Sequence, residues 1–269
     1  MMLSKPFDAL PLWTIGLITV ALIMLAVEAG MWLGRSRRRA LEKKGEAVGG
    51  ESQAGTVIGA MLGLLAFTLG FTFAFAASRF EDRRQAMVHE TNAIGTTYLR
   101  TRLLPDPFGA DMRRLLREYV DIRVAAVTNP TEAKIRQAVV DSEKVQEKLW
   151  LRTVELVKVD QKLPIDALYV ASLNEMIDCQ TTRLAVSRFR IPPVVWAVLY
   201  EVAVLSMGAL GFIFGYSGRG GTGLNLIMAI VFGTVIVLVA DLDNPVVGNL
   251  QVSQTPMIEL QKSINEGPP

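Results

Sequence analysis

Two acidic residues, Glu28 and Glu201, stand inside otherwise apolar segments of the sequence. A carboxylate at the depth of lipid hydrocarbon is costly, and such acids usually face protein or water. We favour an acid near the membrane surface that pairs with an arginine, because Trp32 and Trp196 each lie about one turn away. The alternative is an acid that senses protons or cations along a permeation path.

A second group of oxygen ligands follows the last apolar segment, where the run DLDNP contains Asp241, Asp243 and Asn244. Carboxylate and amide oxygens are the ligands that a hard cation such as calcium prefers. Calcium loops supply more oxygens at defined spacings, however, and Leu242 and Pro245 interrupt this run. We therefore favour an interfacial cap whose carboxylates bind arginines, and a cation site of unknown metal stays the alternative.

A third series lies in GLLAFTLGFTFAFAASRFEDRR, where Phe67, Phe71, Phe75, Arg79 and Arg83 follow one another at four-residue spacing. A ring of phenylalanines can gate a pore by dewetting, and rings of arginines attract anions. Each step rotates the helix by about 40°, so Phe67 and Arg83 differ by about 160° on a straight helix. The alternative, which we favour, is that these phenylalanines only pack against lipid or core.

The same segment carries Gly55, Gly59 and Gly63, also spaced by four. This small-residue pattern lets another helix approach closely in lipid. We interpret these glycines as a surface that packs against a neighbouring span.

Most catalytic chemistry is excluded by composition. His89 and Cys179 are the single histidine and cysteine, so the chain has no intrachain disulfide and no cysteine-based zinc cluster. No nucleophile motif surrounds His89, which we expect on a solvated surface. We expect neither an enzyme nor a cofactor. The net charge of +2, without a basic stripe interleaved with aromatics, also argues against a nucleic-acid partner.

The elements that carry these residues are predicted from the segregation of charge. The chain is 51% hydrophobic, and its charges concentrate in residues 35–51 and 79–190. The apolar blocks predict membrane spans at residues 10–33, 54–77, 194–216 and 224–240. The first is long and weakly charged at its start, which favours an uncleaved anchor over a signal peptide. Pro192 and Pro193 suit the first turn of the third span, and a glycine-rich connection makes spans three and four a hairpin.

The region between spans two and three predicts helices throughout. The second span continues without a break to about Leu104, where PDPF ends it. An amphipathic helix follows at residues 110–127, with arginines opposite its apolar face. Asn129 and Pro130 start a third helix that runs to about Val159, and a fourth runs from near Pro164 to the membrane. The predicted fold is therefore all-α, a polytopic membrane protein with a helical soluble insert, divided into residues 1–78, 79–190, 191–243 and 244–269.

The distribution of basic residues predicts orientation. The loop after the first span holds six Lys and Arg residues, against one Lys before that span. This difference predicts that the loop lies on the cytoplasmic side of a bacterial inner membrane. The insert and both termini would then be periplasmic, although the flanks of the insert are basic too.

Four separated motifs carry a resemblance: FAASRFEDRR, HETNAIGTTYLR, LNEMID followed by Arg183, and DLDNPVVGNLQVSQTP. Together they resemble the bacterial bestrophin-like domain proteins over nearly the whole chain, to about Leu260. Bestrophins are pentameric anion channels with four spans and a mostly helical cytosolic domain. The resemblance implies a homo-oligomer, with span two lining the pore and the insert and both termini in the cytosol. The arginine count gives the opposite orientation, so the side of the insert stays open.

The motifs also single out polar residues of the insert, which we interpret as structural contacts before ligands: Glu90, Asn92, Asn174, Glu175 and Asp178. Our leading prediction is an oligomeric membrane ion channel with anion preference, embedded in the lipid bilayer. The alternative is a non-conducting membrane scaffold or sensor whose helical insert binds a partner.

Overall fold

The computed structural model describes residues 11–45, 51–128, 131–159, 163–218, 222–245 and 248–266, and every regular element in these ranges is a helix. The predicted all-α class is thereby confirmed. The predicted helix start at Asn129 and Pro130 lies outside the described residues. The elements in chain order are α1 (Leu12–Lys44), α2 (Glu51–Arg100), the 3-10 helix η1 (Thr101–Leu103), α3 (Phe108–Val127), α4 (Glu132–Val159), α5 (Leu163–Arg188), α6 (Pro193–Ser217), α7 (Thr222–Asp243) and α8 (Thr255–Glu266).

The chain divides into two compact units. The first, which we call the membrane unit, comprises residues 1–79 and 190–250, and the second, the bundle unit, comprises residues 80–189 and 251–269. Helix α2 contributes residues to both and has no break between Glu51 and Arg100, as its uninterrupted helical pattern predicts. The C-terminal segment from Gln251 onward, expected only as a tail, belongs to the bundle unit and contains α8.

Among the described residues, four helical stretches are long and apolar enough to cross a membrane: Leu12–Lys44, Gly55–Leu103, Pro164–Ser217 and Asn225–Asp243. Pro192 caps α6 and Pro193 occupies its first turn, which confirms the predicted start of that helix. Because proline lacks a backbone N–H, it costs nothing at a position where no donor is needed.

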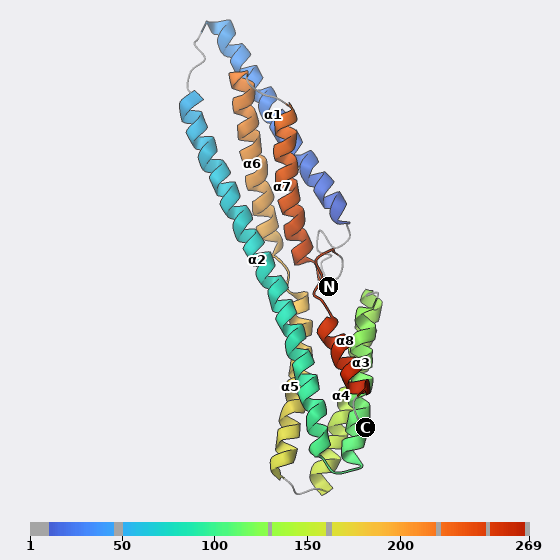
Figure 1. Cartoon of the computed structure of the whole chain (residues 1–269). Coiled ribbons are helices and arrows are strands. Elements are labelled where there is room, and N and C mark those ends of the chain that lie inside the picture. Colours follow the sequence, from blue (N-terminus) through green and yellow to red (C-terminus); the bar gives the residue numbers. More distant parts are fainter. Residues whose placement is uncertain are drawn as a thin grey trace. The chain divides into compact units, whose positions relative to one another are not determined.

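Within the membrane unit, α1 packs against α6 and α7 (Figure 1). The α1–α6 contact depends on glycines. A Cβ atom at Gly30 would overlap the carbonyl oxygen of Gly208, and one at Gly211 would overlap the backbone of Val27. The two helices therefore approach until their backbones touch, which is how small residues hold helices together where lipid removes the hydrophobic driving force.

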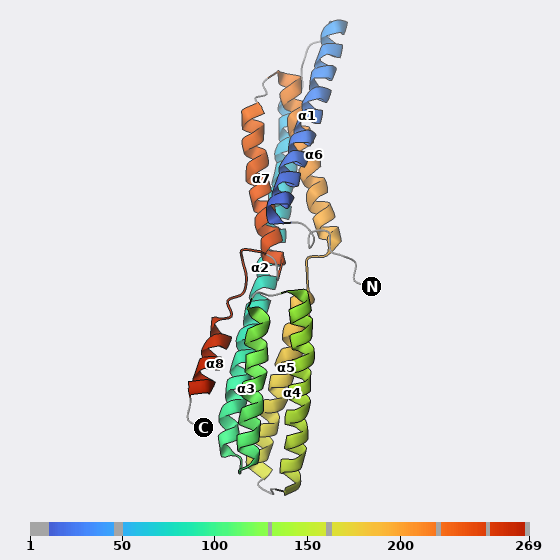
Figure 2. The ribbon, with the colours of Figure 1, turned by 90° about the vertical axis from the view of Figure 1, so that its right-hand side faces the viewer.

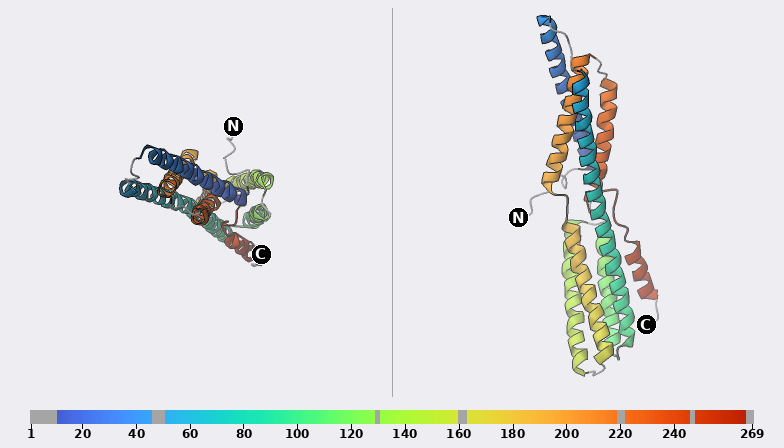
Figure 3. Two further views of the ribbon diagram at one scale, coloured as in Figure 1. Left: turned by 90° about the horizontal axis from the view of Figure 1, so that it is seen from above. Right: turned by 90° about the vertical axis from the view of Figure 1, so that its left-hand side faces the viewer.

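The bundle unit buries large side chains among α3, α4, α5 and the later part of α2, which run side by side (Figures 2 and 3). Tyr119, Leu149 and Tyr169 are fully buried in this core. Helix α8 packs against α3 through the buried Met257 and Ile264. The C-terminal segment is thus a structural part of this unit.

Candidate functional site

A buried ion cluster lies at the centre of the bundle unit. Glu90 of α2 is fully buried, and its Oε1 lies 2.9 Å from Nε of Arg123 on α3. Arg183 of α5 bonds the same carboxylate with Nη1, and its Nη2 donates to Oε1 of Gln254 at 2.7 Å. We call these four residues the Glu90 cluster. It joins three helices and the C-terminal segment.

The charge of Glu90 is set by two opposing effects. Burial alone raises the pKa of this carboxyl, but Arg123 and Arg183 outweigh burial and hold the pKa below its ordinary value of 4.5. Glu90 is therefore ionised at neutral pH. One carboxylate faces two guanidinium groups, so both arginines depend on Glu90 for neutralisation.

Uncharged groups extend this cluster into the core. The hydroxyl of Tyr119 lies 2.5 Å from Oε1 of Gln180, and Gln146 donates to the same oxygen at 2.9 Å. The Tyr119 hydroxyl also lies 3.4 Å from Glu90. Burial raises the pKa of Tyr119, which keeps its hydroxyl neutral. Since each of these groups has a partner, the network fixes how α2, α3, α4 and α5 pack.

Sequence reasoning missed two members of the Glu90 cluster. The arginines of the helix at 110–127 were expected opposite its apolar face, but Arg123 is only 8% exposed, so this expectation is wrong for Arg123. The signal was its spacing, because Arg123 follows Leu116 by seven residues and Tyr119 by four, on the same helix face. Gln254 carried no comparable signal.

Three of the motifs behind the family resemblance meet in the Glu90 cluster. HETNAIGTTYLR supplies Glu90, Arg183 follows LNEMID, and the last motif supplies Gln254. The other polar residues that the resemblance singled out, Asn92, Asn174, Glu175 and Asp178, are exposed. The structure thus brings three of the motifs together in one buried network of ion pairs and hydrogen bonds.

The series of phenylalanines and arginines on α2 separates along the helix. Phe67 is 71% exposed and Phe71 63% exposed, whereas Phe75 is half-buried and Arg79 lies over its ring at 4.8 Å. Arg83 is only 6% exposed. The 40° rotation per step explains this trend, because it carries the series from the open side of α2 to its packed side. The structure therefore does not group Arg83 with Phe67 and Phe71.

The three glycines spaced by four at the start of α2 have no partner among the described residues. A Cβ atom at Gly55, Gly59 or Gly63 would meet no atom within 4 Å. Their predicted packing against a neighbouring span is thus not found within one copy of the chain. The surface remains open on the membrane unit.

The oxygens of the predicted cation site are held by N–H groups. Asp241 accepts from the backbone N–H of Asn249 at 2.9 Å, and Asp243 accepts from that of Ile191 at 2.9 Å. Arg190 donates to the carbonyl oxygen of Asp243 at 2.5 Å and to Asn244 at 3.5 Å. This geometry is that of a cap at the end of α7. Among the described residues, no three His, Cys, Asp or Glu side chains gather as metal ligands would.

The two acids of the apolar segments differ in their surroundings. Glu28 on α1 is half-buried, whereas Glu201 on α6 is exposed. Neither forms a hydrogen bond or ion pair with another described residue. The arginine partner expected for an interfacial acid is therefore missing at both positions in the described part of the chain.

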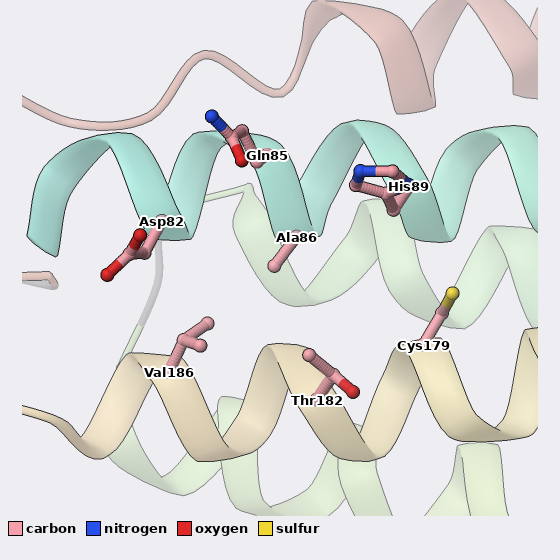
Figure 4. A pocket seen from close by; sticks show the side chains of 7 residues that line it. All are labelled: Asp82, Gln85, Ala86, His89, Cys179, Thr182 and Val186. Atoms are coloured by element: carbon pink, nitrogen blue, oxygen red, sulfur yellow. The ribbon is translucent and has the colours of Figure 1, made fainter. Parts of the chain in front are cut away.

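A pocket of about 300 Å³ lies between α2 and α5 in the bundle unit (Figure 4). His89 and Cys179 both line it, and Cys179 points from α5 toward α2. His89 is exposed, as expected from the sequence. Burial raises the pKa of Cys179, with acidic neighbours adding to the effect. Its thiol is therefore less reactive than a free cysteine.

The fold and sequence agree with known proteins. Residues 21–257 match the model of a protein family described as Bestrophin-like domain. A crystal structure described as a membrane protein superposes with a TM-score of 0.66 at 13% identity, covering 95% of this chain and 97% of that chain.

Two crystal structures of single-site variants of a bacterial bestrophin homologue from Klebsiella pneumoniae are also similar. One has a TM-score of 0.63 at 14% identity over 95% of this chain and 98% of that chain. The other has a TM-score of 0.62 at 15% identity over 94% and 97%. No curated protein is close enough in sequence to count as a relative. At these identities the structures show a shared fold, and with the domain match they establish that this chain belongs to the bestrophin-like family.

Proposed function

We propose that the protein is a homo-oligomeric ion channel with anion preference, in which α2 faces the central axis and the bundle unit forms its soluble part. Bestrophins are anion channels, and the family membership carries that expectation to this chain. A pentamer in a bacterial inner membrane is the assembly that the resemblance implies.

The observation that carries this proposal is the open surface of α2. In the membrane unit its buried positions form one narrow stripe, which includes Ile58, Leu65 and Leu69. Phe67 and Phe71 lie off this stripe and are mostly exposed. One copy of the chain therefore leaves most of this span uncovered.

The open surface has two parts that suit an assembly. The glycine surface at Gly59 and Gly63 lets a second helix approach closely, and no described residue of the same chain occupies it. Phe67 and Phe71 would then line the axis as a hydrophobic constriction that gates by dewetting. Arg79 follows the constriction, and its charge would favour anions.

Anion flux into proteoliposomes tests this arrangement, with Phe71→Ala as the informative variant. Removing a constriction ring should raise flux several-fold over the natural protein. Phe73→Ala is the matched control, because Phe73 lies on the same span, is 39% exposed and falls outside the four-residue series. Flux should stay unchanged there.

Equal effects of Phe71→Ala and Phe73→Ala would remove Phe71 from the pore. A purified protein that is monomeric, or that carries no ion flux in any form, would contradict the channel itself. That result would favour the non-conducting scaffold, with the bundle unit as its partner-binding part.

A further inference from the structure

The length of α6 predicts that Glu201 lies well inside the membrane rather than at its surface. It follows the start of α6 at Pro193 by eight residues and precedes its end at Ser217 by sixteen. At about 1.5 Å per residue, these separations are about 12 Å and about 24 Å. A hydrocarbon core about 30 Å thick, centred on α6, places the backbone of Glu201 about 9 Å below the nearer surface.

The side chain of Glu201 projects from an apolar face. Val194, Val198 and Leu205 occupy the same side of α6 and are 65%, 44% and 56% exposed. Glu201 is exposed among them and bonds to no described residue. An acid thus interrupts an uncovered apolar strip.

No basic side chain of the membrane unit reaches this depth from α1. The hydroxyl of Tyr200 lies 2.8 Å from that of Thr19, which sets Glu201 level with Thr19. The first basic residue along α1 is Arg35, sixteen residues farther and therefore about 24 Å away along the axis. An ion pair requires about 4 Å.

The other helices give the same result. Ser206 donates to the carbonyl oxygen of Met61, and α2 runs opposite to α6 in Figure 1, so Glu201 is level with residues near Ala66. Arg79 lies about 20 Å farther along α2. Arg190 is held at the start of α6 by Asp243. From residue 222 to 240, α7 has no charged residue.

A homo-oligomer cannot supply the missing partner. In a ring around an axis along the membrane normal, each neighbour presents the same segments at the same depth. No described arginine or lysine of a neighbour's membrane unit then meets Glu201 either. The carboxylate must face lipid or water, and an ionised acid in lipid costs several kcal/mol.

We propose that Glu201 faces a water-filled space in the assembled protein and there binds a small monovalent inorganic cation such as Na⁺ or K⁺. A carboxylate surrounded by low-dielectric walls attracts a counter-ion more strongly than one in bulk water. No titrating group on α1, α2 or α7 faces Glu201 at this depth among the described residues. The carboxylate can therefore be neutralised by the cation or by a proton, and the two should compete. The inference rests on the proposed assembly but does not require conduction.

Water access is tested with a single introduced thiol. The Cys179→Ser background removes the native thiol, and Glu201→Cys then provides one at the site. A water-soluble, positively charged methanethiosulfonate reagent should modify it about tenfold faster, or more, than a thiol facing lipid, because thiols react as thiolates. Val231→Cys on α7, where Val231 is 55% exposed, is the matched control. Equal or slower reaction at position 201 would overturn the proposal.

Cation binding is tested with radioactive Na⁺ on the purified natural protein. Bound Na⁺ should fall to background in Glu201→Gln, persist in Glu201→Asp, and be displaced by K⁺ and by acid. Absent binding in the natural protein, or equal binding in Glu201→Gln, would overturn the cation site. If both tests succeed while anion flux is absent, only the channel proposal fails.

Discussion

Where α1 meets α6 in the membrane unit, Gly30 and Gly211 let two helix backbones touch. Where α2 meets α3 and α5 in the bundle unit, a buried carboxylate binds two arginines inside a core of large side chains. Each type of contact suits the surroundings of its unit, lipid for the membrane unit and water for the bundle unit. Lipid gives apolar side chains no reason to associate, so close contact must stabilise the helices.

Water drives the burial of large apolar groups, and the bundle unit can therefore contain charges that are fully paired. The two contacts should fail differently. The membrane contact should be sensitive to added volume, and the Glu90 cluster to altered charge.

Glu90→Gln should have the largest effect on stability. It leaves Arg123 and Arg183 without their shared counter-charge, and breaking a buried pair costs about 3–5 kcal/mol. Hydrogen exchange on α3 and α5 should accelerate strongly, while exchange on α1 and α6 stays near its natural rate. Glu175→Gln, at an exposed position of α5 in the same unit, is the control and should change little. Uniform acceleration in both units would contradict separate stabilisation.

Gly211→Ala should have the next largest effect, confined to the membrane unit. The added methyl would overlap the backbone of Val27, and such overpacking costs about 1–3 kcal/mol. The midpoint of thermal unfolding in detergent should fall. Gly70→Ala adds the same atom on α2 where nothing lies within 4 Å, outside the glycine surface proposed for assembly, and it should be close to neutral. Equal losses in the two variants would show that the α1–α6 contact is not special.

Mild acid should have the smallest effect, and only on the bundle unit. Because the pKa of Glu90 is lowered in the folded protein, the unfolded chain binds more protons, and stability falls as pH falls. The loss from this group stays small above the ordinary pKa of 4.5 and grows as pH falls below it, because the unfolded chain then takes up a proton that the folded chain does not. Comparing pH titrations of the natural protein and Glu90→Gln isolates this contribution. A titration of identical slope in both would assign the acid sensitivity elsewhere.

Helix type and position were readable from the sequence because they follow from local rules. Continuous apolar runs predict α1, α6 and α7, and prolines predict the start of α6. Which helices pack against each other could not be predicted from the sequence in the same way. The four-residue glycine spacing pointed to α2, yet the close contact within the chain uses Gly30 and Gly211. A spacing shows that a helix can approach closely but does not say which helix it meets.

The same limit applies to charged residues. Arg123 was expected opposite the apolar face of its helix, and Arg83 in a series that could line a pore. Only the packing of the bundle unit buries both side chains. Glu201 looked like an interfacial acid because Trp196 is near it. Only the register of α1 and α2 against α6 shows that the described arginines of the membrane unit lie at other depths.

The sequence alone determined an all-helical chain with four apolar segments, because hydrophobic length and helix-breaking residues act locally. Only the tertiary structure decided which motifs meet at Glu90, which glycines touch a backbone and which acid lacks a partner. Those outcomes depend on helix rotation and register, which residues far apart in the sequence settle together.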